Sequence, residues 1–243
     1  MKFNKAAICA VILLILCVFL IAFFCIIAFS TSYGYSVQNN KNSSPVGNFD
    51  VTSRITVIID AGHGGIDPGA VANNLVEKDI NLAVAKKLKD FLSLSGYNVL
   101  LTREEDVALC DANKSSYKRD DLERRLSLVE TTDNCVFVSI HMNKFELESA
   151  GGLQTFYSPN NSESLKLAEC IQTASKVLDP NNKRAVKSDD GNIFILKNTF
   201  KPAVLVECGF LSNPNDAANL SDPVYQNKLA YVLYAGIINY LGE

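Results

Sequence analysis

The chain has 243 residues, which is the length of one domain with an extension. Charged residues make up 20% of it and hydrophobic residues 48%, an ordinary composition for a globular protein. The formal net charge is only −3, and because nucleic-acid binding normally needs a basic face, we expect no nucleic-acid partner.

The first predicted element is an uncharged apolar run, Ala6–Ser30, preceded by Lys2 and Lys5. This run is long enough to cross a bilayer as a helix. No Lys or Arg follows until Lys41, so the positive-inside rule places the rest of the chain outside the cytoplasm. We expect a membrane anchor that holds the protein at the extracytoplasmic face of the cell membrane. The alternative is a signal peptide cleaved near Ala28-Phe29-Ser30, which would release the protein to the cell wall.

Composition divides the chain into three parts. Residues 1–30 form the anchor or signal segment, residues 31–53 have the Ser-, Asn- and Gly-rich composition of a linker, and residues 54–243 form one folded domain. The domain holds four cysteines without a C-x-x-C pair, so a zinc–cysteine site is not expected. Cys135 and Cys208 lie in or beside apolar runs and are predicted to be buried thiols. Disulfides among Cys110, Cys135, Cys170 and Cys208 are the alternative.

Apolar runs alternate with helical patterns along the domain. Strands are predicted at Ile55–Ile59, Tyr97–Thr102, Cys135–Ile140, Gly152–Tyr157, Ile193–Leu196 and Ala203–Val206. Helices are predicted at Glu77–Leu94, Asp121–Glu130, Ser162–Leu178 and Val224–Leu241. This alternation predicts a single α/β domain with a mixed, largely parallel sheet flanked by helices. Ligands of such sheets bind beyond the carboxyl ends of the strands.

Three polar residues follow predicted strands directly. His63 comes after the first strand, His141 after V-S-I, and Glu207 after V-L-V. Parallel strands would bring all three to one edge of the sheet, as a metal site requires. A hydrolytic zinc ion takes three protein ligands and leaves one position for water. The other interpretation is that His63 and His141 are structural residues, which lie at strand ends and only pack there.

Two glutamates complete this candidate site. Glu77 begins the helix after the glycine-rich loop and is the candidate third ligand, or else a charge that favours the helix dipole. Glu207 is the candidate proton acceptor for the attacking water, or else a buried carboxylate paired with a base such as Arg103. The loop around His63 lacks G-K-[ST], so a phosphate-binding P-loop is not supported.

At these residues the sequence resembles the zinc-dependent N-acetylmuramoyl-L-alanine amidases of the amidase-3 family. Five motifs carry the resemblance in the family's order: I-D-A-G-H-G-G-x-D-P-G-A at Ile59–Ala70, E-K-D-I-N-L at Glu77–Leu82, L-L-T-R at Leu100–Arg103, S-I-H-x-N at Ser139–Asn143 and V-E-C-G-F-L-S-N at Val206–Asn213. Five motifs in order, covering nearly all of the folded domain, are highly specific.

The resemblance implies a site and an activity. It implies that His63, Glu77 and His141 bind Zn²⁺, and that Glu207 is the catalytic glutamate. The implied reaction is hydrolysis of the amide that joins N-acetylmuramic acid to L-alanine in peptidoglycan. A different zinc peptidase of the cell wall is the alternative enzyme. An inactive wall-binding module would have lost one of these four residues.

The chain also resembles the germination-type amidase of spore-forming bacteria, because it combines an anchor with a bare catalytic domain and an arginine-rich segment, Tyr117–Glu130. This resemblance implies a role in the spore cortex, where muramic δ-lactam is made. A vegetative amidase for cell separation or wall turnover is the alternative. An activating protein partner is compatible with either role, and the sequence does not identify one.

Overall fold

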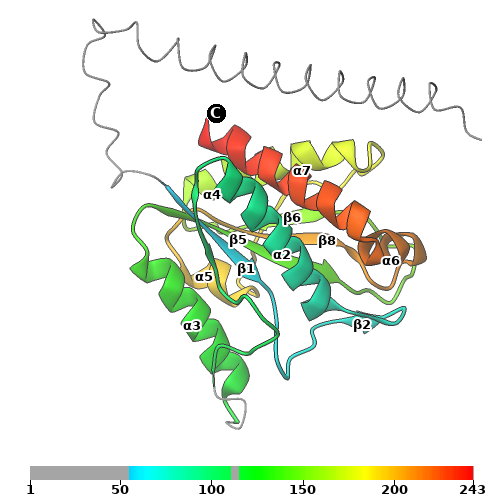
Figure 1. Cartoon of the computed structure of the whole chain (residues 1–243), viewed down its shortest axis with the longest axis horizontal. Coiled ribbons are helices and arrows are strands. Elements are labelled where there is room, and N and C mark those ends of the chain that lie inside the picture. Colours follow the sequence, from blue (N-terminus) through cyan, green and yellow to red (C-terminus); the bar gives the residue numbers. More distant parts are fainter. Residues whose placement is uncertain (1–54, 111–114, 243) are drawn as a thin grey trace, which may run out of the picture. The chain divides into compact units, whose positions relative to one another are not determined.

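The computed structural model of the chain describes residues 55–110 and 115–242 (Figure 1). The predicted anchor, residues 1–30, and the predicted linker, residues 31–53, lie outside these residues. Across 55–110 and 115–242, no helix has the length and apolar character needed to cross a membrane.

A six-stranded sheet forms the centre of the domain, in the order β4-β1-β5-β8-β6-β7. Its strands are β1 (Thr56–Ala61), β4 (Asn98–Leu101), β5 (Cys135–Asn143), β6 (Gln154–Tyr157), β7 (Lys187–Ser188) and β8 (Ala203–Phe210). Strands β4, β1, β5 and β8 run parallel, β6 runs antiparallel to β8, and β7 runs parallel to β6. The predicted mixed, largely parallel sheet is therefore confirmed.

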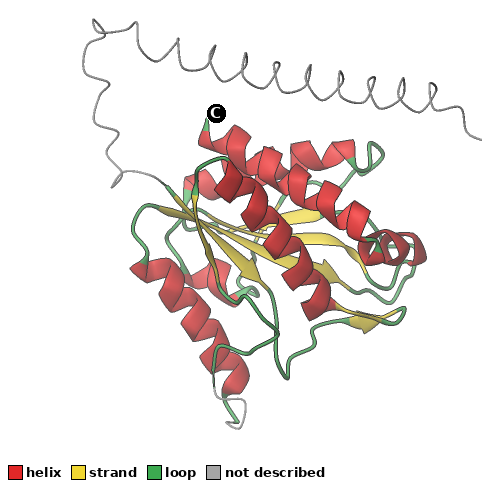
Figure 2. Ribbon diagram, in the orientation of Figure 1, coloured by secondary structure: helices red, strands yellow, loops and turns green. Residues whose placement is uncertain are grey.

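Helices cover both faces of the sheet (Figure 2). One face packs against α2 (Glu77–Leu94), α4 (Ser162–Ala174) and α7 (Pro223–Leu241), and the other against α3 (Tyr117–Thr131) and α5 (Phe194–Asn198). The short helices η2 (Ser175–Val177) and α6 (Pro214–Ser221) and a hairpin of β2 (Val71–Ala72) and β3 (Leu75–Val76) complete the described fold.

The two faces of the sheet differ in how much apolar surface they bury. Alternation along β1 sends Val57 and Ile59 into the larger cluster and Ile58 into the smaller one. Helix α3 contributes only Arg125 and Val129 as buried residues. Leu122, Leu126 and Leu128 also pack against the smaller cluster, so the inward face of the helix is apolar and its buried arginine needs an explanation of its own.

Two predictions about secondary structure are wrong in ways that concern the site. The segment Ile193–Leu196 was expected as a strand but belongs to helix α5, which packs on a face of the sheet instead of joining it. A four-residue apolar run has too little periodicity to separate a strand from a buried helix. His141 and Glu207 were expected just after their strands but lie within β5 and β8, which continue to Asn143 and Phe210.

Cys135, Cys170 and Cys208 form no disulfide in the part of the chain that the structure describes. Cys135 and Cys208 are buried, as predicted, whereas Cys110 and Cys170 are half-buried. Burial raises the pKa of the Cys208 thiol far above its usual range, so this group stays protonated and unreactive.

Candidate metal centre

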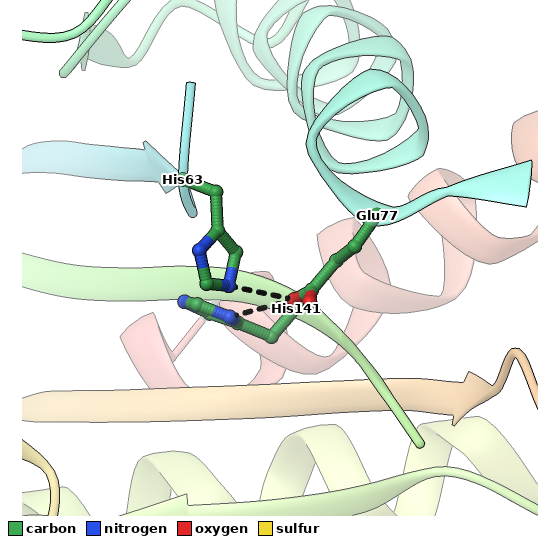
Figure 3. A group of neighbouring side chains, drawn as sticks. All are labelled: His63, Glu77 and His141. Carbon is green, nitrogen blue, oxygen red and sulfur yellow. Dashed lines mark hydrogen bonds and ion pairs between the residues drawn. The ribbon is translucent and has the colours of Figure 1, made fainter. Parts of the chain in front are cut away.

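His63, Glu77 and His141 converge from three different elements (Figure 3). His63 lies in the loop after β1, Glu77 is the first residue of α2, and His141 lies in β5. One potential ligand atom from each residue lies within 4.8 Å of the other two. The Glu77 Oε1 atom is 3.2 Å from His63 Nε2 and 2.9 Å from His141 Nδ1. Three residues far apart in sequence thus point their ligand atoms at one place.

Glycine residues in the loop around His63 make this convergence possible, because they have no side chain. A Cβ atom at Gly62 would lie 2.3 Å from the His141 ring, and one at Gly69 would lie 2.5 Å from Oε2 of Glu77. Both positions are closed to any residue with a side chain unless the site moves. The loop therefore needs glycine for close approach to the candidate ligands, and not merely for turning.

The Glu77 carboxylate accepts hydrogen bonds from outside its own helix. Its Oε2 atom accepts from the Ala70 amide at 2.7 Å, and its Oε1 atom accepts from the Met142 amide at 3.0 Å. Burial opposes ionisation, but hydrogen bonds from His141 and His63 outweigh it and hold the pKa of Glu77 far below its usual range. A charge that served only the helix dipole would face its own first turn, so this alternative is disfavoured.

Asp67 contacts His63 on the side away from Glu77. Its Oδ2 atom is 2.9 Å from His63 Nδ1. Burial lowers the pKa of His63, but Glu77 and Asp67 together raise it above its usual value. A carboxylate on the second ring nitrogen fixes the tautomer and orientation of a metal-binding histidine. Sequence reasoning missed Asp67, although its position in G-H-G-G-x-D, four residues after His63, was a usable signal.

Glu207 is half-buried as a residue, and its carboxylate forms no ion pair with a lysine or arginine among the described residues. Its Oε2 atom is buried and accepts no hydrogen bond from the residues that the structure describes. Burial raises the pKa of Glu207 to about 7, the charge of Glu77 adds to this effect, and His141 and His63 oppose it. The expected alternative partner, Arg103, instead donates to the carbonyl oxygens of Ala61, Gly62, Lys78 and Glu105. The interpretation of Glu207 as half of an Arg103 ion pair is therefore wrong.

A pocket of about 240 Å³ adjoins the two histidines. It lies between the sheet and helices α3 and α5, and its wall is mostly apolar, with Leu122, Phe137 and Leu205 among the lining residues. Helix α5, which sequence reasoning assigned to a strand, supplies part of this wall. The candidate site is thus open on one side to a cavity that could accept part of a substrate.

Comparison with known proteins points to one family. The model of the family described as N-acetylmuramoyl-L-alanine amidase matches residues 57–239. The germination-specific N-acetylmuramoyl-L-alanine amidase of Bacillus subtilis (strain 168) is 36% identical over 214 residues, which cover 87% of this chain and 89% of that protein.

Two solved structures are also similar to this one. The CwlD amidase from Clostridioides difficile, solved in complex with the GerS lipoprotein, is 44% identical with a TM-score of 0.74. The catalytic domain of CwlV, an N-acetylmuramoyl-L-alanine amidase from Bacillus (Paenibacillus) polymyxa var. colistinus, is 33% identical with a TM-score of 0.67. Each alignment covers 77% of this chain and 98% of the other.

Proposed function

Because this chain belongs to the N-acetylmuramoyl-L-alanine amidase family, we propose that it is a zinc-dependent hydrolase that cleaves peptidoglycan between N-acetylmuramic acid and L-alanine. The observation that carries the zinc dependence is the convergence of His63, Glu77 and His141 on one place. Glu207 on the next strand adds the proton carrier that hydrolysis requires.

The donor set fits zinc. Two imidazoles and one carboxylate are a common ligand set of hydrolytic zinc sites, in which a fourth position stays open for water or substrate. Asp67 on Nδ1 of His63 leaves Nε2 free to face Glu77, so the ring is already oriented for binding. Zinc, when bound, would acidify a water molecule and polarise the scissile carbonyl.

Glu207 is proposed to move the proton. As the water oxygen bonds to the carbonyl carbon, the Glu207 carboxylate takes a proton from that water. It then donates the proton to the alanine nitrogen as the C–N bond breaks, so that a free amine leaves. A pKa of about 7 suits both halves of this exchange near neutral pH, because the group can be either base or acid.

The biological setting is proposed from the same likeness. A germination-specific relative, together with the arginine-rich α3, supports a role in spore cortex maturation with formation of muramic δ-lactam. We also propose that residues 1–30 hold the enzyme at the outer face of the cell membrane, since the run Ala6–Ser30 is apolar enough to do so. A relative solved with a lipoprotein supports a protein partner for this chain as well.

Digestion of purified peptidoglycan by the full chain in detergent tests the activity. We expect muramic acid freed of its peptide and stems that begin with L-alanine, with activity lost on chelation and restored by zinc. Undiminished activity in chelator would overturn the zinc dependence. Release of a terminal amino acid with the muramoyl bond intact would identify another peptidase.

Expression in a spore-forming host that lacks its own germination-specific amidase tests the setting. Restoration of muramic δ-lactam in the cortex is expected from the spore role. A chain that digests vegetative wall but leaves the cortex without the lactam would favour cell separation or wall turnover.

A further inference from the structure

Three consecutive carbonyl groups around His63 accept hydrogen bonds from two buried arginines. Arg125 donates from Nη1 to Ala61 at 3.0 Å and from Nη2 to His63 at 2.8 Å. Arg103 donates from Nε to Ala61 at 2.8 Å and from Nη2 to Gly62 at 3.1 Å. Each guanidinium therefore bridges two of the three carbonyls, and together they hold the backbone at the point where it leaves β1.

The backbone at this point adopts an unfavourable conformation. His63 has a φ of 62°, in the left-handed region that residues with a Cβ rarely occupy. Such a conformation persists only where the surrounding structure imposes it. The last backbone bond to the neighbouring strand is that of the Gly62 amide to Ile140, so the pairing of β1 with β5 does not reach His63. The hydrogen bond from Arg125 to the His63 carbonyl holds the backbone one residue past the end of this strand pairing.

Both arginines are buried, at 3% exposure for Arg103 and 2% for Arg125. Arg125 forms ion pairs with Asp60, which is also buried, and with Asp121. Asp60 further accepts hydrogen bonds from Ser139 and Thr102. Burying such groups is expensive, and apolar side chains of similar volume often stabilise a fold as well or better. Stability alone is thus a poor reason for two guanidinium groups here.

The position of Arg125 on α3 adds to this argument. With Val129 it is one of two buried residues of that helix, and the helix also lines the pocket beside the histidines. Arg125 therefore joins this helix to the loop that carries His63, while Val129 and Leu122 pack on the smaller apolar cluster.

We propose that Arg103 and Arg125 are positioning residues for the metal centre, which hold the backbone of His63 so that its imidazole meets Glu77 and His141. They act through the carbonyl groups of Ala61, Gly62 and His63 and touch neither metal nor substrate. The inference rests on the proposed function, because it assumes that the three residues bind zinc.

Lysine substitution tests the proposal without removing the buried positive charge. Arg125→Lys keeps a cation beside Asp60, but an ammonium group lacks the planar fork that reaches two carbonyls at once. Arg103→Lys makes the same change at a residue that forms no ion pair with Asp60. Arg124→Lys, at an exposed neighbour on α3, is the matched control.

The readout is zinc affinity, measured on the metal-free full chain by competition with a chromogenic chelator. We expect Arg125→Lys and Arg103→Lys to bind zinc about 10–100-fold more weakly than wild type, the range found when groups that orient metal ligands are lost. The visible absorption of the Co²⁺ complex should also change, because the angle of one ligand changes. Arg124→Lys should match wild type in both measurements.

Several outcomes would overturn the proposal. Unchanged zinc affinity and an unchanged Co²⁺ spectrum in both lysine variants would overturn it. A lower thermal midpoint of the metal-free variants, with zinc affinity unchanged, would also overturn it, because it would show a role in stability only. If Arg125→Lys does not fold, Arg103→Lys decides. If the wild-type chain binds zinc and loses activity in chelator, but the lysine variants bind zinc as tightly as wild type, the proposed function stands and only the positioning role is refuted. A wild-type chain that binds no zinc refutes the proposed function, and positioning falls with it.

Discussion

His141 and Glu207 are register partners on the neighbouring parallel strands β5 and β8. Side chains at paired positions of adjacent strands project from the same face of a sheet, and the strands lie about 4.8 Å apart. The candidate ligand and the candidate proton carrier are thus held side by side by backbone hydrogen bonds. The register shifts just after this pair, between His141 and Asn143, so the regular ladder ends at the site.

The first prediction concerns Glu207→Gln. The amide keeps the shape of the side chain but cannot take a proton from water, so turnover of peptidoglycan should fall by about 10²–10⁴-fold. Bound zinc, measured by elemental analysis, should stay near one ion per chain. Glu169→Gln on the exposed face of α4 serves as the control and should retain activity. Loss of zinc from Glu207→Gln would instead make Glu207 a ligand.

The same substitution should change how stability depends on pH. Burial raises the pKa of Glu207 from 4.5 to about 7 in the folded, metal-free protein, so the unfolded chain releases this proton first. The free energy of unfolding should therefore decrease as pH rises from 4.5 to 7 and then level off, with a loss on the order of 3 kcal/mol.

Urea unfolding of the metal-free protein at pH 4.5 and pH 8 measures this effect. The glutamine of Glu207→Gln has no proton to release. Between pH 4.5 and pH 8 the free energy of unfolding of this variant should therefore rise relative to that of wild type, by on the order of 3 kcal/mol. An equal response to pH in the two proteins would show that Glu207 ionises normally. Such a response would remove the argument that burial prepares it for proton transfer.

A third prediction concerns the close approach at Gly62. The methyl group of Gly62→Ala would lie 2.3 Å from the His141 ring, so the ring must leave the position in which its Nδ1 atom lies 2.9 Å from Glu77. We expect zinc affinity to fall at least about tenfold, as it does when a ligand loses its orientation. Gly151→Ala, whose methyl group would lie 3.1 Å from the nearest side-chain atom, is the control and should bind zinc normally. Retained affinity in Gly62→Ala would mean that the ring can shift without cost to the site.

The buried pair of Asp60 and Arg125 should make the domain sensitive to acid. Burial opposes ionisation of Asp60, but Arg125 and the Ser139 and Thr102 hydroxyls lower its pKa to about 2. A carboxylate whose pKa is depressed from 3.8 stabilises the fold above that value and stops doing so as pH falls through 2. The loss should be about 2 kcal/mol.

Asp60→Asn isolates this effect. The variant should be less stable than wild type at pH 7, because Arg125 loses a buried partner, but its unfolding free energy should fall less steeply between pH 4 and pH 2. Asp190→Asn, at an exposed position, should follow the wild-type curve. Parallel curves for Asp60→Asn and wild type would show that the Asp60 pKa is not depressed.

Much of the fold was predictable because it depends on local pattern. The helix Glu77–Leu94 was predicted with the bounds that the structure has, since its apolar spacing and its glycine stop signal lie within the segment itself. Helix α5 was mistaken for a strand, and β7 and the β2–β3 hairpin were not expected, because two to five residues carry too little periodicity.

The sequence by itself determined which chemical groups are present and that His63, His141 and Glu207 share one edge of a parallel sheet. Only the tertiary structure decided that His141 and Glu207 are paired inside their strands, that Asp67 orients His63, and that two arginines hold the loop. The physical reason is that most of these contacts join residues that are far apart in the sequence. The bonds from Arg103 and Arg125 to the His63 loop join residues 41 to 64 positions apart, and such contacts exist only once the elements have packed.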